Sequence, residues 1–122
     1  MDSLEIILTE FTKIDGVKQA QVSNSKGEEI CTVLRQGLSA ISVSEVLKEL
    51  GSLSASVIEP LFKKKSLKDV FLNADDLSIN AYFFKNDISL IIVFDEKANL
   101  GRIRLLVRKN QEILEKMNAD KI

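Results

Sequence analysis

The sequence has no histidine and no tryptophan, and only one cysteine and one proline among its 122 residues. The absence of histidine excludes imidazole acid–base catalysis, Ser-His and Cys-His nucleophile pairs and every histidine-containing metal site. The single thiol, Cys31, cannot form an internal disulfide or a four-cysteine zinc site, and a lone thiol is typical of a reducing cytosol. We therefore expect a protein that is not an enzyme and that uses no cofactor and no metal.

The sequence also has no excess of positive charge. The chain has 17 basic and 18 acidic residues, a net charge of −1, so little cation is available to neutralise phosphates and nucleic-acid binding is not expected. No apolar run approaches the ~18 residues of a membrane helix, and Asp2 and Glu5 stand where a signal peptide would have basic residues. These features predict a cytoplasmic protein without membrane insertion.

What is present is a globular composition, with 45% hydrophobic and 29% charged residues. The length fits one domain over residues 1–122. Apolar residues at helical spacing predict a first helix that ends at Asp15-Gly16; they are Leu4, Ile7, Leu8, Phe11 and Ile14. The turn residues Asn24-Ser25-Lys26-Gly27 then predict a β-hairpin made of Val17–Ser23 and Glu28–Leu34.

A second helix is predicted from Ile41 or Ser42 to about Glu59, where Pro60 should kink or end it. Its apolar residues alternate at three- and four-residue spacing, which is typical of a coiled-coil seam. The seam consists of Val43, Val46, Leu50, Leu53 and Val57. A further apolar line beside it means that the helix has two faces to cover. The domain's own sheet can cover one, and we assign the seam to a homodimer interface.

Three strands and a last helix complete the chain. The strands are predicted at about Ser66–Asn73, Leu77–Phe84 and Asp87–Phe94, and their tight turns imply an antiparallel meander. The middle strand has a more apolar and a more polar face, whereas the last strand is apolar on both and should be central and covered on both sides. The last helix should run from about Ala98 to Met117, and its buried face should consist of Leu100, Ile103, Val107, Leu114 and Met117. The order α-β-β-α-β-β-β-α predicts an α+β fold with helices on both faces of one sheet.

This order, with three groups of residues, resembles the roadblock/dynein light-chain family. The first group is Ile14-Asp15-Gly16-Val17 leading into the hairpin, with its turn at Asn24–Glu28. The second is the strand that ends in Leu90-Ile91-Ile92-Val93-Phe94-Asp95. The third and most specific is Ala98-Asn99-Leu100-Gly101-Arg102-Ile103-Arg104, which looks like the start of the family's last helix. The second helix is matched by its periodicity and not by a motif.

The resemblance implies a five-stranded antiparallel sheet in the order 2-1-5-4-3. It also implies a homodimer in which the third strands pair across a two-fold axis and the second helices pack together. Val70 and Leu72 of the third strand therefore join the predicted dimer interface. Family members act as adaptors or regulators of Ras-like small GTPases, bacterial gliding-motility regulators among them, and others are dynein light chains or signalling scaffolds.

We therefore expect a non-catalytic homodimer that binds a Ras-like small GTPase and modulates its nucleotide cycle. The expected docking surface consists of the polar residues of the second helix outside the seam, which are Glu45, Lys48, Glu49, Ser52 and Glu59. No residue is an evident arginine finger, and Arg35 has no support for that role. The alternatives are a light-chain-like scaffold with no effect on nucleotide turnover, and a small-molecule sensor domain.

Other polar residues have ordinary structural explanations. Asp75-Asp76 are typical turn residues, and Asp95 and Glu96 suit the positive end of the last helix. Cys31 is expected to be a buried structural thiol. Lys63-Lys64-Lys65 suits a helix C-terminus and falls short of a lipid-binding cluster. Gly101 is expected to permit close packing of the last helix on the sheet.

Overall fold

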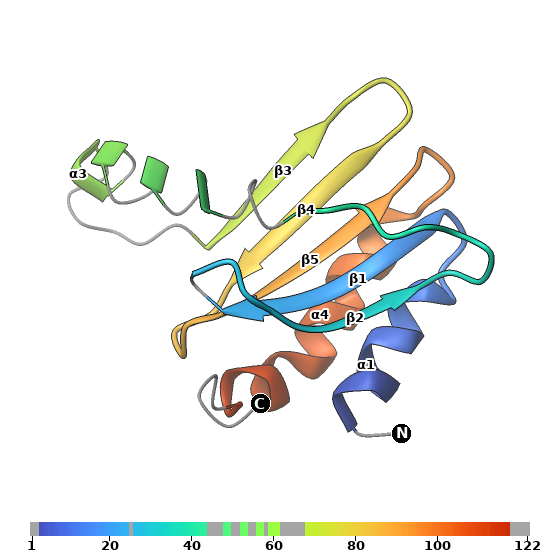
Figure 1. Cartoon of the computed structure of the whole chain (residues 1–122), viewed down its shortest axis with the longest axis horizontal. Helices are drawn as coiled ribbons and strands as arrows, with labels where there is room; N and C mark the ends of the chain where they lie inside the picture. Colours follow the sequence, from blue (N-terminus) through green and yellow to red (C-terminus); the bar gives the residue numbers. More distant parts are fainter. Residues whose placement is uncertain are drawn as a thin grey trace.

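The computed structural model describes residues 3–24, 26–43, 48, 49, 52, 53, 56, 57, 59–61 and 68–117. Figure 1 shows how these residues build one antiparallel sheet in the order β2-β1-β5-β4-β3. The strands are β1 (Val17–Asn24), β2 (Glu29–Leu34), β3 (Asp69–Asn73), β4 (Ser78–Phe83) and β5 (Ile88–Phe94). The helices are α1 (Ser3–Thr12), the short α3 (Glu59–Leu61) and α4 (Leu100–Glu115). The predicted α+β class and strand order are confirmed.

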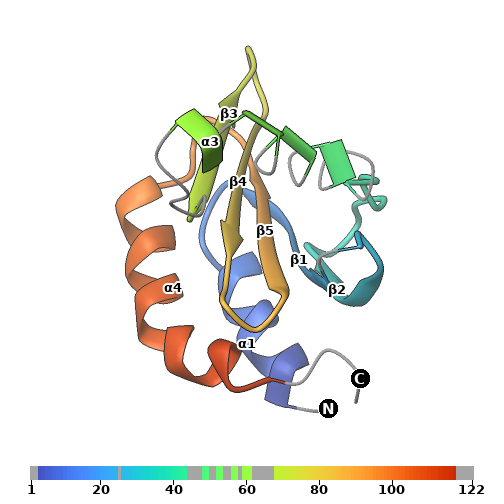
Figure 2. The same ribbon diagram turned by 90° about the vertical axis from the view of Figure 1, so that its left-hand side faces the viewer.

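Strand β5 lies in the middle of the sheet, and all seven of its residues are buried. Leu90, Ile92 and Phe94 belong to a core beneath α1 and α4, which lie on one side of the sheet (Figure 2). Ile91 and Val93 point to the opposite face and belong to a second, smaller core. The prediction of a central strand covered on both sides is therefore confirmed.

The two long helices follow the predicted apolar stripes. In α1, Leu4, Ile7, Leu8 and Phe11 are buried against the sheet. In α4 the buried residues include Ile103, Val107 and Leu114, whereas the predicted Leu100 and Met117 are only partly buried. The α4 termini are capped in different ways. At the start, the Asn99 side chain accepts the Arg102 N–H. At the end, Asn86 of the β4–β5 turn donates to the carbonyls of Leu114 and Met117 at 2.8 and 2.7 Å.

The more polar face of β4 turns out to be the better buried one. Ser78 and Asn80 are buried on the α4 side, where Ser78 Oγ donates to Asn73 Oδ1 and Asn80 Nδ2 donates to the Val70 carbonyl. Tyr82, on the same face, donates its hydroxyl to Asn80, and burial raises the pKa of the Tyr82 phenol. The apolar Ile79 on the other face is only partly buried. Hydrogen bonds satisfy the polar atoms, which makes their burial tolerable.

Only parts of the predicted second helix belong to the described residues. Residues 48, 49, 52, 53, 56 and 57 have helical backbone, and Ser56 Oγ donates to the Ser52 carbonyl one turn earlier. These residues lie on the side of the sheet away from α4 (Figure 2). Pro60 is the middle residue of α3, and the residues that would show a kink or an end of the predicted helix lie outside the described ones. Glu45, Val46, Leu50 and Lys63-Lys64-Lys65 lie outside the described residues.

Gly16 makes a closer backbone approach than Gly37 or Gly101. It has a φ of +86°, and a Cβ there would lie 2.4 Å from the Ala98 nitrogen and 2.6 Å from Asp95 Oδ1. The Asp95 N–H also donates to the Gly16 carbonyl at 2.9 Å. The α1–β1 turn is thus packed directly on the β5–α4 turn, so the first and last motifs of the resemblance meet in space.

The expectation for Gly101 is wrong. A Cβ at Gly101 would meet Asn99 Oδ1 at 3.1 Å and no atom of the sheet, because this residue is exposed in the first turn of α4. Cys31 also differs from its prediction, because it is only partly buried on β2, an edge strand. An edge strand is covered less completely than a central one.

Gly16→Ala should destabilise the fold far more than Gly37→Ala. Gly37 has a similar φ of +84° but no atom within 4 Å of its Cβ position, so alanine there meets only backbone strain of about 1–2 kcal/mol. At Gly16 the clash with backbone atoms adds to that strain, and we expect a total loss of about 3 kcal/mol or more. Urea denaturation of both variants measures the difference. Equal losses of unfolding free energy in the two variants would show that the close contact of Gly16 with Asp95 and Ala98 does not stabilise the fold.

Candidate interaction surface

The described residues contain no group of three or more Cys, Asp or Glu side chains arranged to hold a metal ion. Within the same part of the chain, no helix has the length and apolarity needed to span a membrane. The residues weighed as polar sites have local roles. Asp95 Oδ1 accepts the Lys97 N–H within the β5–α4 turn, and Asp75 and Asp76 are exposed in the β3–β4 turn.

A ladder of buried polar side chains runs along β1 on the face opposite α4. Gln19 Nε2 donates to Gln21 Oε1, and Gln21 Nε2 donates to Ser23 Oγ. Gln19 also donates to the Ile41 carbonyl at 2.9 Å and accepts the Ile41 N–H at 2.7 Å. One amide therefore satisfies both backbone groups of Ile41 and holds the segment before the helical residues against the sheet.

Sequence reasoning did not assign this ladder. Its signal is the alternation of Gln19, Gln21 and Ser23 with the apolar Ala20 and Val22. Such a pattern usually indicates a solvent-facing strand side, but here all three polar residues are buried. Their burial is tolerable because Gln19 bonds to the Ile41 backbone and the three side chains bond to one another.

The residues of the predicted seam lie in different environments. Val43 is 1% exposed and packs with Ala81, Ile91 and Val93, so it belongs to the protomer's own second core. Leu53 and Val57 are each 47% exposed, and Leu61, four residues further on, is 71% exposed. The apolar surface open to a partner therefore begins after Val43.

Strand β3 forms an edge of the sheet, with β4 as its neighbour in the described part of the chain. Val70 and Leu72 pair with Ala81 and Ile79 and so lie on the face of the second core. Val70 is partly buried and Leu72 is 41% exposed. Phe71 points to the other face, where its ring centroid lies 6.0 Å from that of Phe94.

The hydrogen-bond pattern shows which β3 backbone groups point away from the sheet. The Phe83 N–H donates to the Lys68 carbonyl, and the Ala74 N–H donates to the Leu77 carbonyl. Because such pairs alternate along an antiparallel ladder, the backbone groups of Val70 and Leu72 face β4. Those of Asp69, Phe71 and Asn73 point outward and are available to another strand.

The polar residues predicted for partner binding are only partly described. Lys48, Glu49 and Ser52 are exposed. Glu59 is the first residue of α3, and Glu45 lies outside the described residues. Arg35 lies elsewhere, at the end of β2, where its guanidinium is 3.8 Å from the Asp15 carboxylate.

Gln19→Met should release the segment around Ile41 while preserving the sheet. Methionine has a similar volume but cannot satisfy the Ile41 N–H and carbonyl, so amide exchange at Ile41 should accelerate by about tenfold. Hydrogen exchange read by NMR measures this, with the Leu90 amide of β5 as an internal reference. Unchanged exchange at Ile41 would mean that the Gln19 amide does not hold this segment.

Comparison with solved structures identifies the architecture. The gliding protein MglB of Thermus thermophilus superposes with a TM-score of 0.78 at 17% identity, covering 96% of this chain and 88% of that one. Myxococcus xanthus MglB gives a TM-score of 0.76 at 17% identity, covering 95% and 94%. A Roadblock/LC7 domain from Streptomyces avermitilis gives 0.68 at 12% identity, covering 93% and 98%. No family model and no curated protein matches the sequence. The chain has the roadblock fold, as its resemblance implied.

Proposed function

We propose that this protein is a non-catalytic homodimeric adaptor that binds a Ras-like small GTPase and modulates its nucleotide cycle. The observation that carries the proposal is the open β3 edge together with the exposed apolar residues Leu53, Val57 and Leu61. The likeness of fold to MglB and Roadblock/LC7 domains supports it. A partner of this kind would place the protein in the cytoplasm.

Two features of one protomer support the dimer, its open β3 edge and its exposed apolar side chains. An open edge strand with exposed large apolar residues is an aggregation liability unless another strand pairs with it. A two-fold axis beside β3 would let two copies pair antiparallel through the outward groups of Asp69, Phe71 and Asn73, as an isologous interface requires. It would also bury the part of Leu72 that is still exposed, 41% of the residue, which is worth about 1 kcal/mol. We expect the remaining seam residues Val46, Leu50, Leu53 and Val57 to pack against their symmetry mates.

The GTPase would then dock on the polar side of the helical residues. Lys48, Glu49 and Ser52 are exposed on the sheet face away from α4, and we propose Glu45 and Glu59 for the same surface. Regulation would act by holding the switch loops of the GTPase in one arrangement, which shifts its population between states. Arg35 is not assigned a role in turnover, so the groups that act on the nucleotide are those of the GTPase.

Phe71→Pro tests the strand pairing. Proline removes an N–H that points away from β4, so the protomer's own ladder stays intact while the two symmetry-related hydrogen bonds of the dimer are lost. We expect the dimer dissociation constant to rise about tenfold or more. Phe71→Ala is the matched control, because it also removes the ring contact with Phe94 but keeps the N–H.

Analytical ultracentrifugation measures both variants against the unmodified chain, which should sediment near twice the 13.6 kDa protomer mass. A monomeric unmodified chain at micromolar concentration would overturn the dimer. Equal dissociation constants for Phe71→Pro and Phe71→Ala would place the interface elsewhere.

Exchanging the charges of Lys48 and Glu49 tests the docking surface. The Lys48→Glu and Glu49→Lys double variant keeps the net charge but reverses the local pattern, and charges at an interface rim mainly affect association rate. We expect association with a GTP- or GDP-loaded Ras-like GTPase from the same cell to slow about tenfold, with dimer mass and melting temperature unchanged.

The control exchanges Arg108 and Glu112, which are exposed on α4 across the sheet. Surface plasmon resonance with the loaded GTPase compares the two double variants. The docking surface is wrong if the α4 exchange slows association and the Lys48 and Glu49 exchange does not. A stable dimer that binds no such GTPase in either nucleotide state would favour the scaffold alternative.

A further inference from the structure

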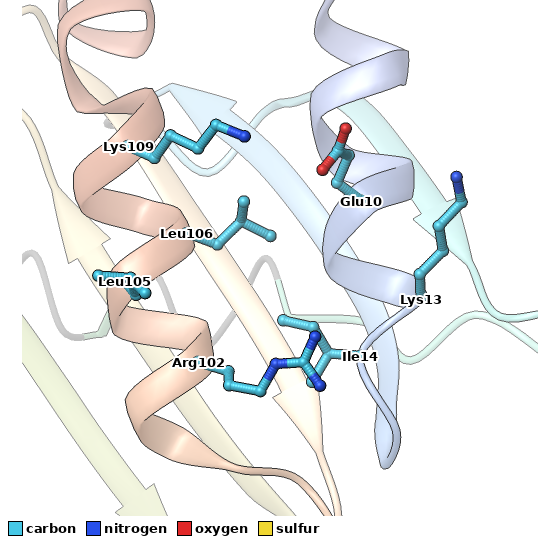
Figure 3. Close-up of a pocket in the computed structure, with 7 residues that line it drawn as sticks. All are labelled: Glu10, Lys13, Ile14, Arg102, Leu105, Leu106 and Lys109. Atoms are coloured by element: carbon cyan, nitrogen blue, oxygen red, sulfur yellow. The ribbon is translucent and has the colours of Figure 1, made fainter.

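The α1–α4 face of the sheet carries a groove of its own. The groove has a volume of about 350 Å³ and lies between the last turn of α1 and the first half of α4. Ile14 and Leu106 contribute apolar side chains between the two helices, and Leu106 points across the gap towards α1 (Figure 3). Leu105 at the rim is 65% exposed. The apolar surface is thus large enough to receive one or two apolar side chains of a ligand.

The charged residues of the groove are mostly basic. Lys13, Arg102 and Lys109 line it together with a single carboxylate, that of Glu10. The whole chain has one more acidic than basic residue, so this local excess of two positive charges is a departure from its average. Charge complementarity therefore selects an acidic ligand.

The position of Arg102 strengthens this argument. Arg102 is the third residue of α4, and the first turn of this helix contains no acidic residue. A helix N-terminus bears partial positive charge, so a cation there is disfavoured by roughly 0.3–1 kcal/mol. Asn99 already caps this end through the Arg102 backbone. Helix stability thus gives no reason for the Arg102 side chain, whereas an acidic ligand in the groove does.

The spacing of the cations favours an elongated ligand over a compact anion. Arg102 and Lys109 are seven residues apart on one helix, or about 10 Å along its axis. In Figure 3 the Arg102 guanidinium lies near Ile14, the Lys109 amine extends towards the Glu10 side of the groove, and the Lys13 amine points away from both. These cations do not converge on one point, so a phosphate or a small carboxylate could not engage them together.

We propose that the groove binds an acidic peptide segment of a partner protein, with an apolar side chain placed between two carboxylates about 10 Å apart. The apolar side chain packs on Leu105, Leu106 and Ile14, while the carboxylates pair with Arg102 and Lys109. Because the groove is on the α4 side of the sheet, the GTPase surface and the β3 edge remain accessible. The protein would then hold two different partners on opposite faces. The proposal does not depend on GTPase binding.

The test uses a fluorescein-labelled peptide of glutamate and leucine, in which two leucines are flanked by glutamates, and fluorescence anisotropy with the full chain. The same peptide with lysine in place of every glutamate is the charge control. The acidic peptide should bind, its affinity should fall with added salt, and the lysine peptide should bind at least about tenfold more weakly. Failure of the acidic peptide to bind would overturn the proposal.

Two protein variants locate the site. Arg102→Glu with Lys109→Glu should weaken peptide binding at least about tenfold, since it places two more acids in the groove. Arg108→Glu with Lys116→Glu makes the same change of net charge on the same helix outside the groove, and should keep most of the affinity. Leu105→Ser, at an exposed position, should also weaken peptide binding, because the apolar side chain of the ligand packs on Leu105.

Equal losses in the two charge variants would show non-specific attraction to a basic helix and would overturn the groove. Dimer mass and GTPase association are measured on the same samples. Both should be unchanged in the Arg102 and Lys109 variant, so failure of the groove proposal and failure of the proposed function are distinguishable.

Discussion

Complete burial of β5 is the constraint on which the rest of the structure depends. Its seven residues are buried on both faces, so the sheet needs a cover on each side. Helices α1 and α4 supply one cover with a large apolar core. On the other side the described cover is smaller, with Ile41 and Val43 over Ala81, Ile91 and Val93. The two sides are therefore unequal, and on the second side Leu53, Val57 and Leu72 remain exposed.

Polar contacts attach the covering segments to the sheet at a few points. The Gln19 amide holds Ile41 over the second face, and Asn86 holds the end of α4 over the first. Gly16 lets the α1–β1 turn rest on the β5–α4 turn with no side chain between them. Each contact joins segments far apart in the sequence. They explain how a small sheet keeps its covers in place.

The unequal covers also separate the surfaces available for binding. The open β3 edge and the exposed Leu53, Val57 and Leu61 favour pairing with a second copy, whereas the groove beside α4 is basic and partly apolar. An apolar edge and a charged groove select different ligands. Binding at the edge is stabilised by burial of apolar surface, whereas binding in the groove is stabilised by opposite charges on the ligand. A dimeric adaptor with partners on opposite sides of its sheet would use both.

The sequence by itself determined the elements and their order. Periodic apolar residues located α1 and α4, turn residues located the hairpins, and an apolar run on both strand faces placed β5 at the centre, because these signals depend on neighbours within a few residues. The strand order came from the resemblance carried by the motifs around Gly16 and Asn99. The apolar spacing also proposed Leu53 and Val57 for an interface, whereas Leu72 was proposed from the resemblance; all three side chains are exposed.

Only the tertiary structure decided which side of β1, of β4 and of the segment around Val43 is covered. Val43 has the same spacing as the rest of the seam, yet it is buried in its own protomer because Gln19 holds Ile41, two residues earlier, against the sheet. Gln21, Ser78 and Asn80 look solvent-facing in sequence but are buried, since hydrogen bonds satisfy them. The basic groove joins Lys13 to Arg102 and Lys109, which are about ninety positions apart. Long-range contacts of this kind leave no local pattern, because they depend on which segments the fold brings together.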